Sequence, residues 1–347
     1  MTAYARKKTY EASRQGAFHV WNRCARQLHL WGKDPLTNKD YSHRRDWWMV
    51  RLEQFAGLFA IDVEFHAELG NHFHLMLRTN PRIPQRWGSE KVARNWLIAS
   101  RLAKSHSDEL PRVTQEQIDA LVKDKKKIKK LRRRLSNISW FVGFLCENIA
   151  RRANREDETS GKFWAERFRC RECTDLNAIL VCGVYIDLNA MRAGEARSIE
   201  TSRYTSIYQR IQAQSQRRNA KDRADGWLGE LTRAPESLRD ETLAITSRMG
   251  RRASDLGLLP ISLDDYLKLL KWTMKELRAG RRQTIPGDMD AILESLSIEG
   301  EMWLEVVDSY QETFCHVIGP ADQMREAARR MGTRCLRGTP TAARAFH

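Results

Sequence analysis

The chain has 347 residues, of which 41% are hydrophobic and 30% are charged; this length allows two domains, and this composition excludes a wholly disordered chain. Lys and Arg exceed Asp and Glu enough to give a net charge of +16, which favours nucleic acid as the partner because each neutralised phosphate releases a counterion. No apolar run of about 18 residues is present and none follows the basic N-terminus, so we expect neither a membrane span nor a signal peptide.

The first part of the chain predicts a strand, a helix and a hairpin, in that order. Residues 17–23 are apolar, aromatic and β-branched, as in a strand, and residues 44–59 carry apolar side chains at helical spacing. Residues 61–69 and 72–78 are predicted as two further strands joined by a Gly70-Asn71 turn. This order begins a β-α-β-β pattern.

An insertion is predicted from about residue 81 to 135, where prolines and a glycine break the pattern before a short helix at 90–104. Nine of the twelve residues at 123–134 are basic. A solvated helix face or a flexible arm would explain this run, but we favour an arm that contacts phosphates. Its candidate DNA-binding residues are Lys125, Lys126, Lys127, Arg132, Arg133 and Arg134.

The second part predicts α-β-α. Residues 136–154 have helical periodicity, residues 163–173 resemble a loop that leads into a strand, and Asp175 could cap a helix that ends near Asn189. The whole order, β-α-β-β-α-β-α, predicts an α+β fold: a ferredoxin-like sandwich with one extra helix.

The tail after the sandwich is predicted as mainly helical. We therefore divide the chain into a catalytic domain at 1–205 and a helical accessory domain at 206–347. Residues 206–225 are polar and suit a linker or an exposed helix, and Ser262 with Asp265 resembles a capping box. Further helices are predicted at 288–296, 301–314 and 321–331.

The cysteines suit a reducing compartment, because an odd number of them, seven, is scattered along the chain. We expect a cytoplasmic, nucleoid-associated protein of the bacterial type. Cys170 and Cys173 form one C-x-x-C, but a structural zinc site usually needs a second pair. On a strand this spacing places the two thiols on opposite faces, and we interpret them as unpaired.

His72-Phe73-His74 is the strongest local chemical signal. Residues two apart on a strand share a face, so both imidazoles would project together while Phe73 enters the core. Two parallel imidazoles make half of a site for a divalent metal ion. A pair of ordinary surface histidines is an equally good interpretation of this motif alone.

A second signal lies in the helix predicted after Asp175. Tyr185 and Asn189 are four residues apart and share a helical face. The phenol could act as a nucleophile and the amide as a third metal ligand. Taken alone, a packed tyrosine and a capping asparagine explain the pair better.

Four segments together resemble the REP-associated and related insertion-sequence tyrosine transposases of the HUH superfamily. They are FHVWNR, ELGNHFHLMLRT, GKFWAERFRC and YIDLNAMRAGEA, in the order of that family and over about residues 16–205. Gly70 and Ala190 stand where the family has prolines, at positions that carry no chemistry. The resemblance does not cover the insertion or the tail.

The resemblance implies a site and a reaction. His72, His74 and Asn189 would bind Mg²⁺ or Mn²⁺, and Tyr185 would be the nucleophile. The substrate would be single-stranded or hairpin DNA, and the products would be a 5′-phosphotyrosine and a free 3′-hydroxyl. Two copies acting as a homodimer could exchange strands.

Other interpretations remain open. Tyr204 or Tyr208 could be a second nucleophile, as in two-tyrosine enzymes of the superfamily, and His66 is a neighbour of the motif rather than a ligand. The chain could be a domesticated, non-cleaving nucleic-acid binder, or a zinc hydrolase with a further His, Asp or Glu ligand. Arg23 and Arg192 are two more candidates for phosphate contacts, although a solvated arginine explains Arg192 equally well.

Overall fold

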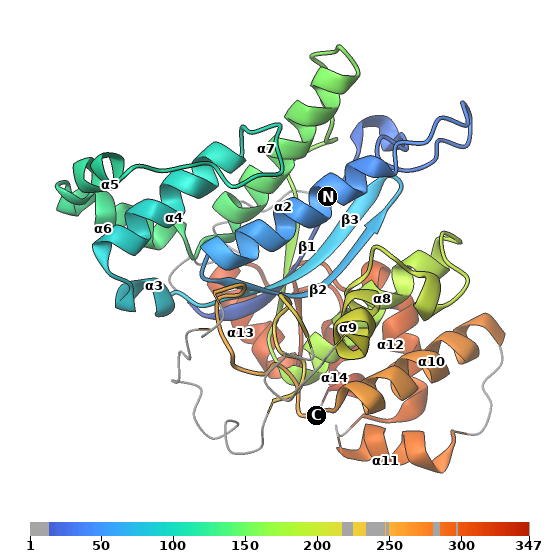
Figure 1. Cartoon of the computed structure of the whole chain (residues 1–347). Coiled ribbons are helices and arrows are strands. Elements are labelled where there is room, and N and C mark those ends of the chain that lie inside the picture. Colours follow the sequence, from blue (N-terminus) through green and yellow to red (C-terminus); the bar gives the residue numbers. More distant parts are fainter. Residues whose placement is uncertain are drawn as a thin grey trace.

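A five-stranded sheet organises the computed structural model, which describes residues 14–216, 225–233, 247, 250–279, 285–295 and 298–346 (Figure 1). The strand order is β2-β3-β1-β4-β5. Neighbouring strands are antiparallel except β4 and β5, which are parallel. The strands are β1 (Gly16–Arg23), β2 (Ile61–Leu69), β3 (His72–Thr79), β4 (Arg169–Cys173) and β5 (Val317–Ile318). The chain therefore has an α+β fold, and the strands predicted at 17–23, 61–69 and 72–78 are confirmed.

Two long helices cover one face of the sheet: α2 (His43–Leu58) and α7 (Ile138–Glu156). Their buried side chains form one hydrophobic core with Phe73 and other side chains from the sheet and with Trp31 from the segment between β1 and α2. Trp48 of α2 lies 4.5 Å from Phe73, measured between ring centroids. Both helices were predicted from apolar periodicity, and burial of that periodic face explains why they form here.

The insertion folds into helices rather than a flexible arm. Its elements are α3 (Ile83–Arg86), α4 (Ser89–Leu102), α5 (Gln115–Val122) and α6 (Lys125–Arg134). The basic run itself forms α6, because Asp124 caps its N-terminus and the apolar pair Ile128 and Leu131 is buried. The lysines of α6 are exposed on the other side of the helix.

The helix α8 (Leu176–Arg192) covers the opposite face of the sheet, and the Asp175 side chain caps it by accepting the Ala178 backbone N–H. Gly183 allows α8 to approach β2 closely, since a Cβ there would lie 2.6 Å from the Phe65 ring. This close approach holds the middle of α8 against the sheet. Cys170 and Cys173 lie in the cores on opposite sides of the sheet, as their spacing predicts.

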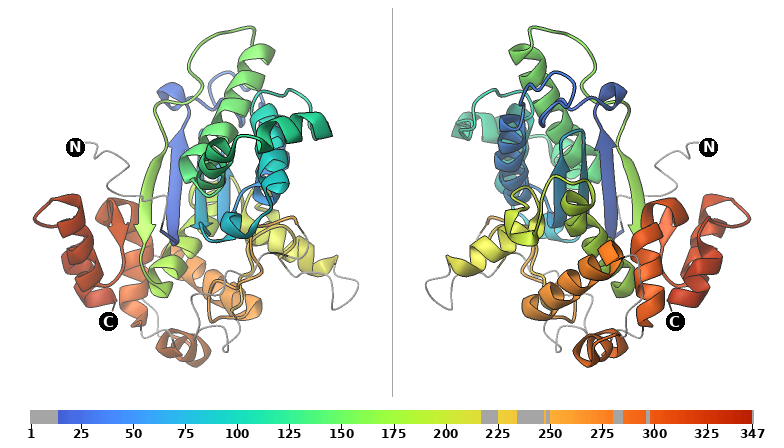
Figure 2. Two further views of the ribbon diagram at one scale, coloured as in Figure 1. Left: turned by 90° about the vertical axis from the view of Figure 1, so that its left-hand side faces the viewer. Right: turned by 90° about the vertical axis from the view of Figure 1, so that its right-hand side faces the viewer.

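The tail continues the hydrophobic core around α8 and is mainly helical. Its three last helices lie beside β4, away from α2 and α7 (Figure 2). One half of the predicted capping box is present, since the Ser262 hydroxyl accepts the Asp265 backbone N–H; the Asp265 carboxylate accepts from the Ser262 hydroxyl. A short α14 and the strand β5 were not predicted, and the end of the helix predicted to reach residue 296 lies outside the described residues. The tail helices are α9 (Ser206–Ser215), α10 (Leu263–Ala279), α11 (Gly287–Ser295), α12 (Gly300–Thr313), α13 (Ala321–Met331) and α14 (Thr339–Ala345).

The division of the chain at residue 205 stays a prediction. Asp187 of α8 accepts hydrogen bonds from Ser206 and Ile207 at the start of α9 and from Tyr266 of α10, so the two sides of that division are joined in one buried network. Within the described ranges, no helix is long and apolar enough to cross a membrane.

Candidate active site

The two histidines of β3 lie on one face of the strand and Phe73 lies on the other. The His72 and His74 rings are 5.1 Å apart between centroids and nearly perpendicular. Phe73 packs into the core beneath α2. The alternation expected of a strand therefore brings both imidazoles to the face that α8 covers.

Tyr185 of α8 meets the same face. Its ring centroid lies 5.6 Å from that of His74, in an edge-to-face arrangement. One turn later, the Asn189 Nδ2 group donates to the Tyr185 carbonyl oxygen at 2.8 Å. Tyr185 is 7% exposed and His74 is 3% exposed, so both rings are largely withdrawn from solvent.

Burial sets the protonation of these groups. It raises the pKa of Tyr185, while a hydrogen bond from Asn189 and the positive charges of Arg171 and Arg192 offset part of that rise. Burial lowers the pKa of His72 to about 4 and holds the pKa of His74 well below its usual range. At neutral pH the site therefore holds a phenol and two neutral imidazoles, each with one lone pair on a ring nitrogen.

The donor set fits a divalent metal ion. The His72 Nδ1 atom lies 2.5 Å from the Asn71 Oδ1 atom, which can only accept, so Nδ1 carries the proton and Nε2 keeps its lone pair. The Asn189 amide bonds Tyr185 through its nitrogen, which leaves its oxygen for another role. Two imidazole nitrogens and an amide oxygen are ligand types that divalent ions accept.

The described residues hold no group of three or more His, Cys, Asp or Glu side chains placed to bind a metal ion. A zinc hydrolase would need such a further ligand beside His72 and His74. His66 is not that ligand, because it is buried against Glu68 at 2.9 Å and stacks on Trp227. The donor set thus does not support the hydrolase interpretation.

The other candidate tyrosines lie elsewhere. The Tyr204 hydroxyl donates to Asp46 of α2 at 3.0 Å, and the Arg45 guanidinium lies over its ring. Tyr208 belongs to α9 and is partly exposed. Of these three tyrosines, Tyr185 is the one whose ring packs against the histidine pair, through its contact with His74.

Two residues at the centre of the site were missed from the sequence. His19 of β1 places its Nε2 atom 2.9 Å from the Nδ1 atom of His74. The Tyr310 hydroxyl of α12 lies 3.2 Å from the His19 Nδ1 atom, and its ring lies 4.7 Å from that of Tyr185. The alternation of β1 in FHVWNR was a signal for His19, but no local pattern marked Tyr310.

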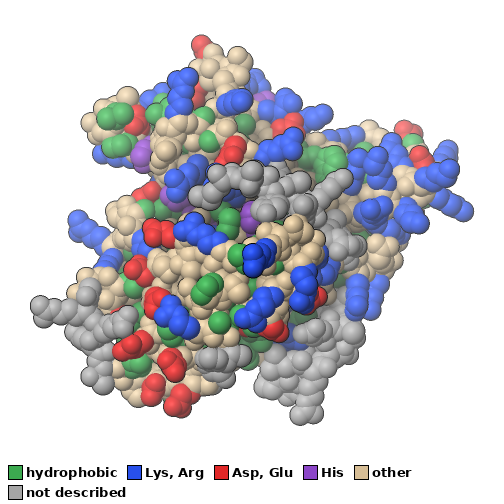
Figure 3. Space-filling model, turned by 180° about the vertical axis from the view of Figure 1, so that it is seen from behind, with side chains coloured by type: hydrophobic (Ala, Val, Ile, Leu, Met, Phe, Trp, Pro, Cys, Tyr) green, Lys and Arg blue, Asp and Glu red, His purple; other side chains and the backbone are tan. Residues whose placement is uncertain are grey.

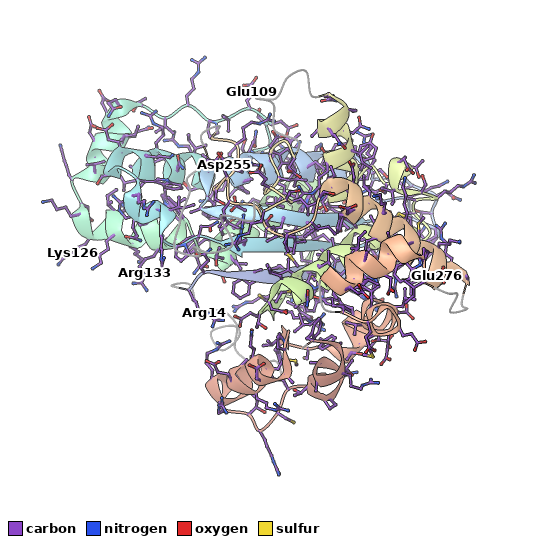
Figure 4. The ribbon with its side chains drawn as sticks, turned by 90° about the horizontal axis from the view of Figure 1, so that it is seen from below. Arg14, Glu109, Lys126, Arg133, Asp255 and Glu276 are labelled. Atoms are coloured by element: carbon purple, nitrogen blue, oxygen red, sulfur yellow. The ribbon has the colours of Figure 1, made fainter. Side chains whose placement is uncertain are left out.

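The predicted DNA-binding residues fall into separate groups. Arg23 is exposed and pairs with His72 across β1 and β3, so it lies at the site. Lys125, Lys126, Lys127 and Arg133 are exposed on α6, and Lys126 and Arg133 extend outward from that end of the molecule (Figure 4). His72 is the first residue of β3, whereas the insertion begins after Thr79, the last residue of that strand. The length of β3 therefore separates α6 from the histidines.

Three predicted DNA-binding arginines instead make contacts with other parts of the protein. Arg132 donates to the carbonyl oxygens of Pro84 and Trp87. Arg134 stacks on the rings of Trp96 and Trp140. Arg192 donates to the exposed Asp308 side chain of α12 at 2.9 Å, its own side chain is 34% exposed, and its guanidinium lies 5.8 Å from the centre of the Tyr185 ring. Tertiary contacts, which the local charge pattern does not reveal, explain these differences.

No family model and no curated protein matches the sequence. A solved structure of a REP-associated tyrosine transposase bound to a REP hairpin is similar to this chain with a TM-score of 0.34 and 10% sequence identity. The match covers 61% of this chain and 86% of that one. A likeness at this level is weak.

Proposed function

We propose that this chain is a metal-dependent transposase that cuts and rejoins single-stranded DNA, with Tyr185 as the nucleophile. One observation carries the proposal: a histidine pair on β3 and Tyr185 on α8, more than 100 residues later, meet on one face of the sheet, and Asn189 follows Tyr185 one helical turn later. A chance His-x-His pair at the surface has no reason to face a buried tyrosine. The order β2-β3-β1-β4, antiparallel throughout, supports a ferredoxin-like sandwich with α8 as the extra helix.

The proposed reaction is a transfer between two oxygen atoms. The Tyr185 oxygen forms a bond to phosphorus, the bond from phosphorus to the 3′-oxygen breaks, and that oxygen leaves as a hydroxyl. The 5′-phosphotyrosine conserves the energy of the phosphodiester, so attack by a 3′-hydroxyl rejoins a strand without ATP. Two copies acting as a dimer could exchange strands in this way.

Each residue of the site has a proposed role. His72, His74 and Asn189 would hold Mg²⁺ or Mn²⁺, which when bound polarises a phosphate oxygen and stabilises charge in the transition state. Arg23, exposed beside His72, would hold the phosphate backbone of the strand. On the rear face, Lys and Arg side chains are spread over much of the surface, as a DNA path needs (Figure 3).

A second candidate function is a non-cleaving nucleic-acid binder. It is favoured by one observation: the Tyr185 side chain is only 7% exposed and packs against the Tyr310 ring, 4.7 Å away between centroids. The two candidates differ in whether a covalent adduct forms.

A covalent adduct that depends on metal is the first expected result. A labelled library of single-stranded oligonucleotides, including hairpins, is incubated with the full chain in Mg²⁺ or Mn²⁺, and the products are resolved on a denaturing gel. We expect a protein–DNA adduct with metal and none with EDTA, because the phosphate needs its charge neutralised for in-line attack. Tight binding without an adduct in either buffer would favour the non-cleaving binder.

Neutralising the exposed lysines of α6 is expected to weaken DNA binding at all sequences. In the variant Lys125→Gln, Lys126→Gln, Lys127→Gln, the slope of log K against log salt for single strands should fall by about 2, because each phosphate that a lysine neutralises adds about 0.7 to that slope. Fluorescence anisotropy across a salt series measures this slope.

The matched control removes three exposed lysines of α10, Lys268, Lys271 and Lys275, and therefore the same net charge. It should change the slope much less. An equal effect of the two triple variants would mean that net charge, and not contact with α6, governs binding.

A further inference from the structure

A buried chain of hydrogen-bonding groups lies behind His74. It runs from His74 of β3 to His19 of β1 at 2.9 Å and from His19 to Tyr310 of α12 at 3.2 Å. His19 and Tyr310 are fully buried. Both ring nitrogens of His19 are thus used, and the ring nitrogen of His74 that stays outside this chain is Nε2.

The direction of donation along these hydrogen bonds decides whether the Nε2 atom of His74 carries a hydrogen. A neutral imidazole has one N–H donor and one lone pair. If His74 donates from Nδ1 to His19, then His19 donates to the Tyr310 oxygen, and His74 Nε2 keeps a lone pair. If Tyr310 donates to His19, every proton moves one place and His74 Nε2 carries a hydrogen, which excludes metal binding there.

A second acceptor allows the first direction. The Tyr310 hydroxyl is also within hydrogen-bonding reach of the Cys182 thiol of α8. It can therefore donate to sulfur while it accepts from His19, and no buried donor is left without a partner.

Contacts with Arg171 of β4 fix the position of Tyr310. The Arg171 guanidinium of β4 lies 4.5 Å from the centre of the Tyr310 ring and donates to the Tyr310 carbonyl oxygen at 3.3 Å. It also donates to the carbonyl oxygens of Phe314 and Cys315, just beyond α12. These contacts hold the last turn of α12 against the sheet. The Tyr310 hydroxyl could therefore move away from His19 only if several of them broke.

We propose that His19 and Tyr310 are positioning residues that orient the His74 ring and keep Nε2 as its metal-binding atom, so that α12 of the tail is part of the active centre. This inference rests on the proposed function, because it assigns a purpose to the metal site. Hydrogen-bond partners of metal-binding histidines commonly change metal affinity by about 10–100-fold when removed.

Calorimetric titration of the full chain with Mn²⁺, without DNA, tests the inference. Tyr310→Phe removes the acceptor for His19 but keeps the ring against Tyr185, so its Kd for Mn²⁺ should rise by about 10–100-fold. Tyr204→Phe, which removes a hydroxyl bonded to Asp46 of α2, is the matched control and should bind as the wild type does. At saturating Mn²⁺, adduct formation by Tyr310→Phe should recover, since the nucleophile is intact.

The outcomes separate the two ideas. Wild-type binding that disappears in His74→Ala but is unchanged in Tyr310→Phe would overturn the inference and leave the proposed function standing. Absence of any Mn²⁺ binding that depends on His74 would overturn the proposed function, and the inference with it.

A second measurement needs no substitution of His19, His74 or Tyr310. Long-range ¹H–¹⁵N spectra of the wild-type chain in Mg²⁺ show which ring nitrogen of each histidine carries the proton. We expect the proton of His74 on Nδ1 and that of His19 also on Nδ1. A proton on His74 Nε2 would contradict the inference even if Tyr310→Phe failed to fold.

Discussion

Tyr185→Phe is expected to abolish the covalent protein–DNA adduct, with a loss of at least about 10³-fold in the rate of strand cleavage. The substitution removes only the hydroxyl oxygen that would bond to phosphorus. The ring that contacts His74 and Tyr310 stays, so the packing of α8 should be preserved. The readout is the adduct band on a denaturing gel, with DNA affinity measured alongside by anisotropy.

DNA affinity of Tyr185→Phe should remain within about twofold of the wild type, because phosphate contacts from basic groups, not the phenol, supply most of the binding free energy. Tyr204→Phe serves as the matched control and should form the adduct normally. An adduct that persists in Tyr185→Phe would move the nucleophile to another tyrosine, with Tyr204 and Tyr208 tested next.

Arg171→Met is expected to lower the free energy of unfolding by about 4 kcal/mol. Arg171 is buried, and its guanidinium donates to the carbonyl oxygens of Tyr310, Phe314 and Cys315. The carbonyls of Phe314 and Cys315 lie just beyond the C-terminal end of α12, where the helix itself offers no donors, whereas the Tyr310 carbonyl also accepts the Phe314 N–H. Methionine keeps the apolar stem but removes the donor from the Phe314 and Cys315 carbonyls, and each acceptor left without a partner costs about 1–3 kcal/mol.

Urea denaturation followed by circular dichroism measures this effect. Arg169→Met is a close control, since Arg169 lies two residues earlier on β4, its side chain is 64% exposed, and its guanidinium bonds the nearby Glu166 carboxylate. That variant should leave the unfolding midpoint unchanged. Equal midpoints for Arg171→Met and the wild type would show that the contacts of Arg171 contribute nothing net to stability.

Local patterns predicted the framework of the site because that framework is made of local geometry. The alternation of β3 places His72 and His74 on one face, and the helical repeat places Tyr185 beside Asn189. The Gly70-Asn71 turn joins β2 to β3 as predicted. Each of these relations spans four residues or fewer, where backbone periodicity alone decides which side chains share a face.

The basic run at residues 123–134 shows a feature that local patterns did not predict. Nine basic residues in twelve indicated an arm, but Ile128 and Leu131 bury one side of the run and make it a packed helix. Charge counts treat all its residues alike, whereas burial separates them: Lys126 is exposed and Arg132 bonds the backbone of the α3 region.

By itself, the sequence determined the first four strands and the long helices, the pairing of His72 with His74, and the pairing of Tyr185 with Asn189, because each depends on the period of one element. Only the tertiary structure decided that Tyr185 meets His74, that His19 bonds His74 from β1, and that Tyr310 of α12 bonds His19. Tyr310 lies 291 residues after His19, and their contact arises because both pack in the space between the sheet and α8. Contacts across such separations depend on how whole elements pack, and no short pattern encodes that packing.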